Sequence, residues 1–293
     1  MSWTIKQALQ EAASLFRAAG IEAPRSEAEY LLCFVLRRER AYLYSHGDNI
    51  LTEEQRGRFQ GLADRRSGKV PLAYITGEKE FMGKTFRVNP HVLIPRPETE
   101  HLVEAVIHWL KSAYPKAQEG QGLNMLDLGT GCGNIAIMLA LHFPAAAVTA
   151  VDISQEAVKM ARKNIRFHGV ERRVHVFCGG YWDFFAPDRH RFHVIVSNPP
   201  YIPESGMDSL MAEVQKEPPL ALAGGPDGLA AYRQILPGVR NHLVSPGLAA
   251  LEIGEGQAGA VKALGQAAGL SVKDVIQDYG NRERVICFEV QVV

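Results

Sequence analysis

Apolar, β-rich runs alternate with helix-like runs over the second half of the chain, and this alternation constrains the fold more than any other feature. Strands joined through helices run parallel, so the pattern predicts right-handed βαβ units and a mostly parallel sheet buried on both faces. Two further runs at the end of the chain have no room for a helix between them, so the last strand should run antiparallel. In order, the runs cover residues 125–128, 148–152, 174–178, 194–197, 248–253, 272–277 and 285–290.

The N-terminal part of the chain has a helical period instead. Apolar residues recur at helical spacing over residues 5–16, as expected for an amphipathic helix. Two capping-box patterns, Ser26 with Glu29 and Thr52 with Gln55, mark expected helix starts. We therefore expect several short helices that pack as a small bundle.

A change of pattern separates these two parts. Residues 81–88 look like two short strands around a Gly turn. Residues 93–100 follow, with two prolines and two glutamates ahead of a helical pattern, which indicates a rigid bend that leads into a helix. We expect an all-helical bundle over residues 1–75, a β-hairpin linker over 76–92 and an α/β domain over 93–293.

Composition excludes several classes of protein. The 293 residues are 46% hydrophobic, which suits about two domains with buried cores. Thirty-two basic and 32 acidic residues give no net charge, so neither a nucleic-acid nor a membrane partner is expected. The four cysteines and ten histidines lack disulfide or metal spacing, which predicts no metal site. With no long apolar run, we expect a cytoplasmic protein.

A glycine-rich turn joins the first predicted strand to a helix. Residues 127–134 read Asp-Leu-Gly-Thr-Gly-Cys-Gly-Asn, and glycines at such a turn let the backbone approach a ligand beside the helix N-terminus. Asp152 ends the next strand, where a carboxylate can accept hydrogen bonds from ribose hydroxyls. The glycines are spaced G-x-G-x-G rather than G-x-G-x-x-G, so a dinucleotide, a different ligand and a purely structural turn all stay open.

A second motif, Asn198-Pro199-Pro200-Tyr201, follows the fourth strand at the edge where open α/β sheets bind ligands. The prolines have no amide donors, so nearby carbonyls stay available as acceptors. Asn198 adds a side-chain oxygen and Tyr201 a ring face. Together they form a clamp for a planar NH2 group, which predicts an amide or an exocyclic amine as the target. A strand ended by a structural turn is the plainer interpretation.

With these motifs, the chain resembles the glutamine N5-methyltransferases that modify peptide chain release factors. The Asn-Pro-Pro-Tyr motif alone is shared with several amino-methyltransferases, and the proline-rich segment 93–100 makes the resemblance more specific. The segments that carry it are 71–77 with 80–83, 93–100, 127–133, 197–202, 217–218 with 221–222, 227–229, 232–233 and 251–254.

The resemblance implies a Rossmann-like class I methyltransferase domain and an activity. The activity is methyl transfer from S-adenosylmethionine to the glutamine of the Gly-Gly-Gln motif of class I release factors, with S-adenosylhomocysteine as the second product and no metal. The helical bundle, residues 1–75, would recognise the release factor. The family often places an acidic residue just before the tryptophan near the adenine, whereas here Asp183 follows Trp182.

The resemblance also implies roles for single residues. The methionine part of the donor would lie on Gly129, Thr130, Gly131, Cys132 and Gly133, the ribose on Asp152, and the adenine beside Trp182. Asn198 would contact both donor and glutamine, Asn198, Pro199 and Tyr201 would be catalytic, and the glutamine site would consist of Asn198, Pro199, Pro200 and Tyr201.

Two other functions compete with this one. A methyltransferase acting on base amines of RNA or DNA would share the clamp, but it would need a basic groove that the neutral charge disfavours. A non-catalytic protein could keep a nucleotide-binding fold and use its helical bundle as an interaction module. The intact clamp motif favours an enzyme over that possibility.

Overall fold

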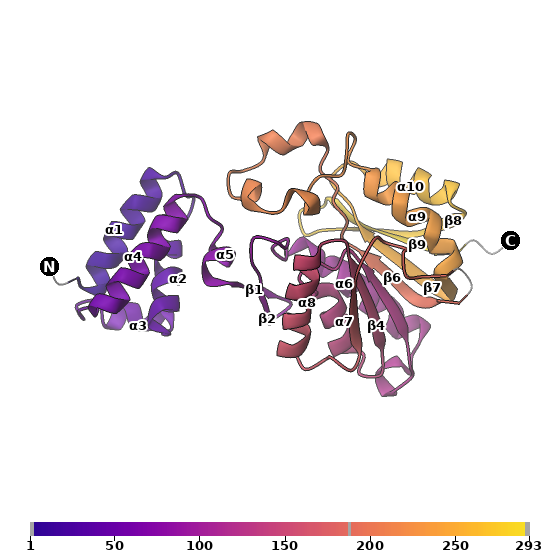
Figure 1. The fold of residues 1–293 in the computed structure, drawn as a ribbon, viewed down its shortest axis with the longest axis horizontal. Coiled ribbons are helices and arrows are strands. Elements are labelled where there is room, and N and C mark those ends of the chain that lie inside the picture. Colours follow the sequence, from indigo (N-terminus) through magenta and orange to yellow (C-terminus); the bar gives the residue numbers. More distant parts are fainter. Residues whose placement is uncertain (1–2, 187–188, 291–293) are drawn as a thin grey trace. The chain divides into compact units, whose positions relative to one another are not determined.

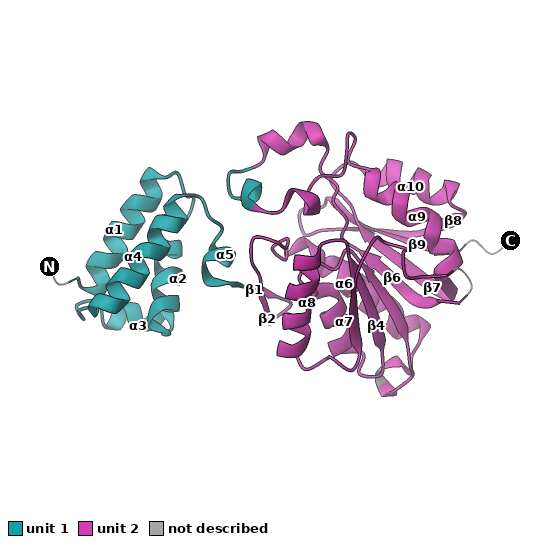
Figure 2. Ribbon diagram, viewed as in Figure 1, with its two compact units in different colours: residues 1–78, 211–216 teal, residues 79–210, 217–293 magenta. Residues whose placement is uncertain are grey.

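The structure, a computed structural model, describes residues 3–186 and 189–290. It divides into two compact units, which Figure 2 shows in different colours: residues 1–78 with 211–216, and residues 79–210 with 217–293. The division at residues 75 and 92 stays a prediction. Of the predicted domains, residues 1–2, 187–188 and 291–293 lie outside the described residues.

Unit 1 is a helical bundle, as predicted. Helices α1, α2 and α4 contact one another, and Phe16, Leu31 and Phe59 are fully buried between them. Burying side chains of this size stabilises the bundle by about 1.5–3 kcal/mol each. The helices are α1 (Ile5–Ala18), α2 (Pro24–Leu36), α3 (Arg40–Ser45), α4 (Glu53–Ser67), α5 (Leu72–Thr76) and η3 (Val214–Lys216).

One of the two predicted capping boxes exists. Thr52 caps α4, and its side chain and that of Gln55 satisfy the two backbone amides reciprocally. The prediction for Ser26 and Glu29 is wrong, because α2 already begins at Pro24, whose ring suits a first helical position. Glu29 is instead buried and accepts hydrogen bonds from other side chains of the bundle.

Residues 211–216 belong to unit 1 through a buried arginine. The Arg66 guanidinium is 2% exposed, and it pairs with Glu27 at 2.5 Å and with Glu213 at 2.7 Å. A buried cation needs such partners, because leaving it unpaired would cost several kcal/mol. The segment between η2 (Glu204–Ser209) and η4 (Pro219–Ala221) is thus tied to the bundle by an ion pair.

Unit 2 is an α/β domain built on a sheet of order β5-β4-β3-β6-β7-β9-β8. The strands from β5 to β7 are parallel, and β9 runs antiparallel to both β7 and β8, as predicted. Buried apolar residues on both faces of β3 and β6 explain their continuous hydrophobic runs. The strands are β3 (Asn124–Leu128), β4 (Ala147–Asp152), β5 (Val174–Cys178), β6 (Phe192–Ser197), β7 (Leu243–Glu252), β8 (Leu270–Gln277) and β9 (Glu283–Val290).

Helices cover both faces of this sheet. Figure 1 shows α9 and α10 on one face and α6, α7 and α8 on the other, consistent with the contacts between neighbouring helices. Among the described residues, no helix combines the length and apolar character needed to span a membrane. The helices are α6 (Glu98–Ala113), α7 (Asn134–His142), α8 (Gln155–Phe167), α9 (Ala230–His242), α10 (Ala258–Ala267) and the short η1 (Ala117–Glu119).

The predicted hairpin is present as β1 (Glu78–Phe81) and β2 (Lys84–Arg87). Asn164, fully buried on α8, ties this hairpin to the glycine-rich turn. Its side chain accepts a hydrogen bond from the Arg87 amide at 2.8 Å and donates to the carbonyls of Arg87 and Cys132 at 2.9 and 2.8 Å. One side chain thus satisfies three backbone groups.

Removing this side chain should destabilise unit 2. We expect Asn164→Ala to lower the free energy of unfolding by about 2 kcal/mol or more, because each buried backbone group left unpaired costs about 1–3 kcal/mol. Urea unfolding measures the change. The control is Lys163→Ala, an exposed neighbour on the same helix, which should stay within about 0.5 kcal/mol of the parent. Equal stability of the two variants would contradict this role.

Candidate active site

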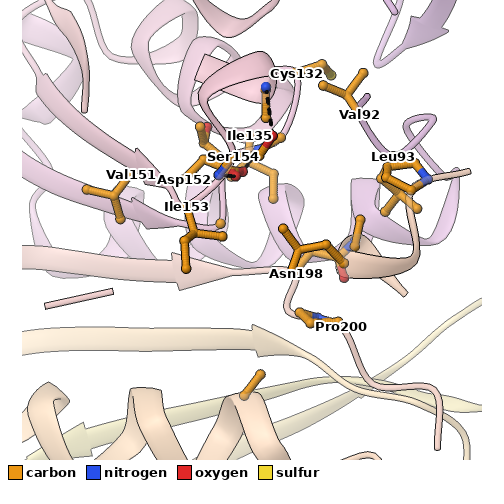
Figure 3. Close-up of a pocket in the computed structure, with 18 of the residues that line it drawn as sticks. Val92, Leu93, Cys132, Ile135, Val151, Asp152, Ile153, Ser154, Asn198 and Pro200 are labelled. Atoms are coloured by element: carbon orange, nitrogen blue, oxygen red, sulfur yellow. Dashed lines mark hydrogen bonds between the residues drawn. The ribbon is translucent and has the colours of Figure 1, made fainter. Parts of the chain in front are cut away.

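A cavity of about 320 Å³ lies at the carboxyl ends of the parallel strands of unit 2. This volume is within the range of about 300–1,000 Å³ common for small-molecule sites. Figure 3 shows Asp152 and Ser154 on one side of the cavity and Asn198 and Pro200 on another. Its walls come from the turns after β3, β4, β5 and β6, from residues 91–99 and from segments near η4 and α9.

The glycine-rich turn forms the wall after β3. Gly131 has a φ of 56°, a conformation that favours glycine, and a Cβ there would meet nothing within 4 Å. Gly133 has a φ of 87°, and a Cβ there would lie 3.3 Å from Cδ1 of Ile137 and 3.4 Å from the Cβ of Ala161 on α8, so its backbone conformation and its close surroundings both favour glycine. The amides of Gly129 and Thr130 both donate to the Val151 carbonyl at 2.9 Å, which holds the turn beside β4.

Asp152 joins this turn to the end of β4. One carboxylate oxygen accepts from the Gly131 amide at 2.8 Å and the other from the Ser154 amide at 2.9 Å. Burial raises the pKa of Asp152, and these two amide bonds oppose that shift. Each carboxylate oxygen has a further lone pair, so the group can still accept hydrogen bonds from a ligand in the cavity.

Asp127 lies beneath the turn and is fully buried. One oxygen accepts from the Thr130 hydroxyl at 2.6 Å and from the Ala136 amide at 3.2 Å. The other oxygen has no hydrogen-bond partner among the described residues. Burial raises the pKa of Asp127 to about 7, despite these two donors. Asp127 therefore supports the turn from inside the domain.

The Asn-Pro-Pro-Tyr motif begins directly beside the glycine-rich turn. β6 pairs with β3 so that Ser197 lies opposite Leu128, and the buried Ser197 hydroxyl donates to the Leu128 carbonyl at 2.6 Å. Asn198 follows and donates from Nδ2 to the Thr99 hydroxyl oxygen at 3.0 Å. Among the described residues, no backbone amide donates to the Pro199 carbonyl, so this carbonyl is available as an acceptor.

One side chain and two glycines from later segments of the chain pack against this motif. The Gln257 amide donates to the carbonyls of Tyr201 at 2.9 Å and Gly228 at 3.3 Å. A Cβ on Gly228 would lie 2.4 Å from the Tyr201 carbonyl oxygen, and one on Gly254 would lie 3.0 Å from the Tyr201 ring. Both positions therefore need glycine for close approach to the motif.

The proline-rich segment forms another wall and is held by a buried glutamate. Glu217, 3% exposed, accepts from the Ile94 amide at 3.0 Å and forms an ion pair with Arg96. Leu93, Pro95 and Arg96 line the cavity. Glu217-Pro218 and the proline-rich segment are far apart in the sequence, but these contacts bring them together in the folded domain.

The structure brings most of the predicted site residues to this cavity, but not all. Tyr201 lies outside the lining, and its hydroxyl donates to the Glu252 carboxylate at 3.4 Å. Gly133 and Pro199 also lie outside the lining of this described cavity. The predicted residues that line it are Gly129, Thr130, Gly131, Cys132, Asp152, Asn198 and Pro200.

Trp182 is placed differently from its neighbours in the predicted set. Its ring stacks on His242 at 4.7 Å, and its indole nitrogen donates to the Gln234 carbonyl at 3.0 Å. The preceding residue, Tyr181, lines the cavity instead, together with Ile153. This placement favours Tyr181 over Trp182 as a wall for a flat ligand group.

Thr99 and Glu252 also belong to the site, although no role was expected of them. Both lie in segments on which the family resemblance rests, and both are at least 98% buried. The signal in the sequence is the position of Glu252, a carboxylate at the carboxyl end of an apolar strand, which is the ligand-binding edge of the sheet. Within the described part of the chain, no group of three or more His, Cys, Asp or Glu side chains could hold a metal ion.

Comparison with known proteins identifies the family. Residues 7–77 match the family described as PrmC N-terminal domain, and residues 109–222 match Methyltransferase small domain. The release factor glutamine methyltransferase of Moorella thermoacetica is 44% identical over 97% of both chains. The chain belongs to the release factor glutamine methyltransferase family. Another member, from Neisseria gonorrhoeae, is 38% identical over 89% of this chain and 92% of its own.

Solved structures support the fold of this family member. A methyltransferase from Pyrococcus furiosus has a TM-score of 0.53 at 20% identity, covering 82% of this chain and all of its own. The T. thermophilus 16S rRNA N2 G1207 methyltransferase has a TM-score of 0.52 at 18% identity, covering 73% of this chain and 50% of its own. These likenesses show a methyltransferase fold, and the family match shows that the chain is a methyltransferase.

The buried Asp127 should make stability depend on pH. Its pKa is about 7 in the folded chain and about 3.9 when unfolded. Between these values the folded state retains a proton that the unfolded chain releases, so stability falls as pH rises, by at most about 1.4 kcal/mol per pH unit for this group. Asp127→Asn should flatten that fall.

Urea unfolding of the ligand-free protein at pH 5, 6, 7 and 8 measures this dependence. The matched control is Glu156→Gln, an exposed carboxylate on α8, which should keep the slope of the parent. The pKa of Glu252 is also raised to about 7, so part of the fall should remain in Asp127→Asn. An unchanged slope in Asp127→Asn would show that its carboxyl does not titrate in this range.

Proposed function

We propose that this chain transfers a methyl group from S-adenosylmethionine to the side-chain nitrogen N5 of the glutamine in the Gly-Gly-Gln motif of class I release factors. The observation that carries this proposal is that Asn198 and Pro200 line the same cavity as the glycine-rich turn, at strand ends joined by the Ser197 hydroxyl. Membership of the release factor glutamine methyltransferase family supports the choice of substrate.

The cavity fits the methyl donor. A glycine turn with open space at Gly131 admits a ligand close to the backbone, and Asp152 can accept from ribose hydroxyls. Ile153 and Tyr181 supply apolar surface for the adenine, and Cys132 contributes to the wall beside the methionine part. When bound, S-adenosylmethionine supplies an electrophilic methyl group on its sulfonium, and its product is S-adenosylhomocysteine. This chemistry needs no metal.

The Asn-Pro-Pro-Tyr motif would hold the glutamine. Its amide NH2 group can donate one hydrogen to the Asn198 Oδ1 and the other to the Pro199 carbonyl, while Pro200 and Tyr201 shape the site. Two acceptors fix the direction of the nitrogen lone pair, and positioning of this kind can supply about 7–11 kcal/mol of a barrier. A strong general base is unnecessary, because the nitrogen becomes acidic once it bonds to carbon.

The remaining assignments follow from this activity. We assign release-factor recognition to the helical bundle, residues 1–75, a linking role to residues 76–92 and methyl transfer to residues 93–293. The substrate partner is a protein of the translation machinery, which fits a cytoplasmic enzyme. The absence of net charge argues against nucleic acid as the direct substrate and against a membrane partner.

A methylation assay tests this function directly. The full-length protein is incubated with methyl-labelled S-adenosylmethionine and a purified class I release factor, and the peptide that contains Gly-Gly-Gln is analysed by mass spectrometry. We expect one methyl group on the glutamine. Asn198→Ala should turn over about 10²- to 10³-fold more slowly, because it removes an acceptor aimed at the reacting group.

Two controls accompany this assay. A release factor with the motif glutamine replaced by glutamate should accept no label, and circular dichroism should show that Asn198→Ala is folded. An unmodified glutamine with the parent protein, or near-normal turnover of Asn198→Ala, would refute the proposal. Labelling of RNA or DNA, lost steeply as salt is added, would favour the base-amine alternative.

Donor binding depends on Asp152 in this scheme. Asp152→Ala should weaken S-adenosylmethionine binding about 10- to 100-fold, because it removes one or two hydrogen bonds to a charged group and with them their contribution to the binding free energy. Isothermal titration calorimetry measures the affinity. Glu156→Ala, an exposed carboxylate four positions along, should bind the donor like the parent. Unchanged affinity of Asp152→Ala would show that its carboxylate does not contact the donor.

A further inference from the structure

A chain of three polar side chains runs from the cavity into the interior of unit 2. Asn198 donates from Nδ2 to the Thr99 hydroxyl oxygen at 3.0 Å, and the Thr99 hydroxyl donates to the Glu252 carboxylate at 2.6 Å. The three residues come from the turn after β6, the first turn of α6 and the end of β7. Thr99 and Glu252 are 2% and 1% exposed.

The Thr99 hydroxyl, in the middle of these hydrogen bonds, fixes which group donates and which accepts. An ionised carboxylate only accepts hydrogen bonds, so Thr99 must give its single hydroxyl hydrogen to Glu252. The Thr99 oxygen can then only accept from Asn198. That requirement turns the Asn198 Nδ2 toward Thr99 and places Oδ1 at the opposite end of the planar amide.

The orientation matters because the two ends of an asparagine amide have nearly the same shape. With Oδ1 presented, Asn198 accepts a hydrogen from the NH2 group of a glutamine. With the amide turned over, it would present a donor to another donor, and the clamp would lose one of its two acceptors. Packing alone discriminates weakly between these orientations, whereas a fixed hydrogen-bond partner discriminates strongly.

We propose that Glu252 and Thr99 are positioning residues that set the orientation of the Asn198 amide for methyl transfer. This inference rests on the proposed function for its effect on turnover, but the orientation itself is a property of the free protein. The Glu252 carboxylate also accepts a hydrogen bond from the Tyr201 hydroxyl at 3.4 Å. One carboxylate thus contacts, directly or through Thr99, both ends of the Asn-Pro-Pro-Tyr motif.

The charge of Glu252 depends on the groups around it. Burial raises the pKa of Glu252 to about 7, and nearby Glu98 adds to that effect. Arg284 opposes it, as do the hydroxyls of Thr99 and Tyr201 that donate to the carboxylate. The Tyr232 hydroxyl donates to the backbone carbonyl of Glu252 at 2.8 Å and leaves its carboxylate to these partners.

Protonation of Glu252 should allow the hydrogen bonds between Asn198, Thr99 and Glu252 to reverse their direction. A protonated Glu252 can donate to Thr99, whose own hydrogen can then go to the Asn198 Oδ1 of a turned amide. The correctly oriented fraction therefore rises with pH as the carboxyl ionises, and so should kcat. Glu252→Gln, which resembles the protonated state, should lack this rise between pH 6 and 8.

Kinetics with the full-length protein and a release factor tests the effect on turnover. We expect Glu252→Gln and Thr99→Val to lower kcat about 10- to 100-fold, since small errors of placement can cost about 10²-fold. Thr99→Ser keeps the hydroxyl and should stay near the parent. Glu255→Gln, an exposed carboxylate three positions along, is the matched control and should keep the parental pH profile. Donor affinity and melting temperature verify that each variant is folded.

A second measurement needs no substrate. With selective ¹⁵N-asparagine labelling, the side-chain NH2 signal of Asn198 is identified by its loss in Asn198→Asp. It should titrate with a midpoint near pH 7 in the parent and in Thr99→Ser, but not in Glu252→Gln or Thr99→Val. A signal that does not respond to pH or to these variants overturns the inference.

The two measurements separate this inference from the proposed function. If the parent leaves release factors unmethylated while the Asn198 signal titrates as described, the function fails and the orientation stands. If the parent is active but Glu252→Gln keeps its kcat and pH profile, or Thr99→Val equals Thr99→Ser, the positioning roles are refuted and the function stands.

Discussion

The parallel pairing of β3 with β6 is the constraint on which the site depends. It aligns Leu128 with Ser197, and the Ser197 hydroxyl donates a hydrogen bond to the Leu128 carbonyl, which joins the two strands at their carboxyl ends. The glycine-rich turn and the Asn-Pro-Pro-Tyr motif start from these two residues, so the methyl donor and the glutamine proposed to bind them would be neighbours. Neither motif alone could place two bound molecules side by side, because each motif forms only one side of the cavity.

Much of the site is built by residues that contact no ligand in this scheme. Asn164 holds the glycine-rich turn to the hairpin, Gln257 holds the Tyr201 carbonyl, and Glu217 holds the proline-rich segment. Each is a polar side chain that satisfies backbone groups of an irregular segment, which would otherwise be unpaired and free to move. Preorganisation of the cavity therefore comes from the interior of the domain as much as from its lining.

The comparison of sequence with structure shows where pattern analysis succeeds. Strand β6 follows from a nearly continuous apolar run, because a strand covered on both faces leaves that signature. The capping box at Ser26 failed, since the same letters occur inside a helix that Pro24 had already started. Trp182 and Tyr181 are adjacent aromatic residues that the sequence does not distinguish. The structure does, because Trp182 stacks on His242 whereas Tyr181 lines the cavity.

The sequence by itself determined the α/β class, the order of the strands along the chain and the two motifs that meet at the sheet edge, because these depend on periodicity and on short-range turn chemistry. Only the tertiary structure decided which residues stand behind the motifs. Thr99 and Glu252 lie far apart in the chain, and their link to Asn198 exists only because α6 and β7 pack against each other. Hydrogen bonds between distant segments leave no periodic trace in a sequence, so their partners become visible only in the folded protein.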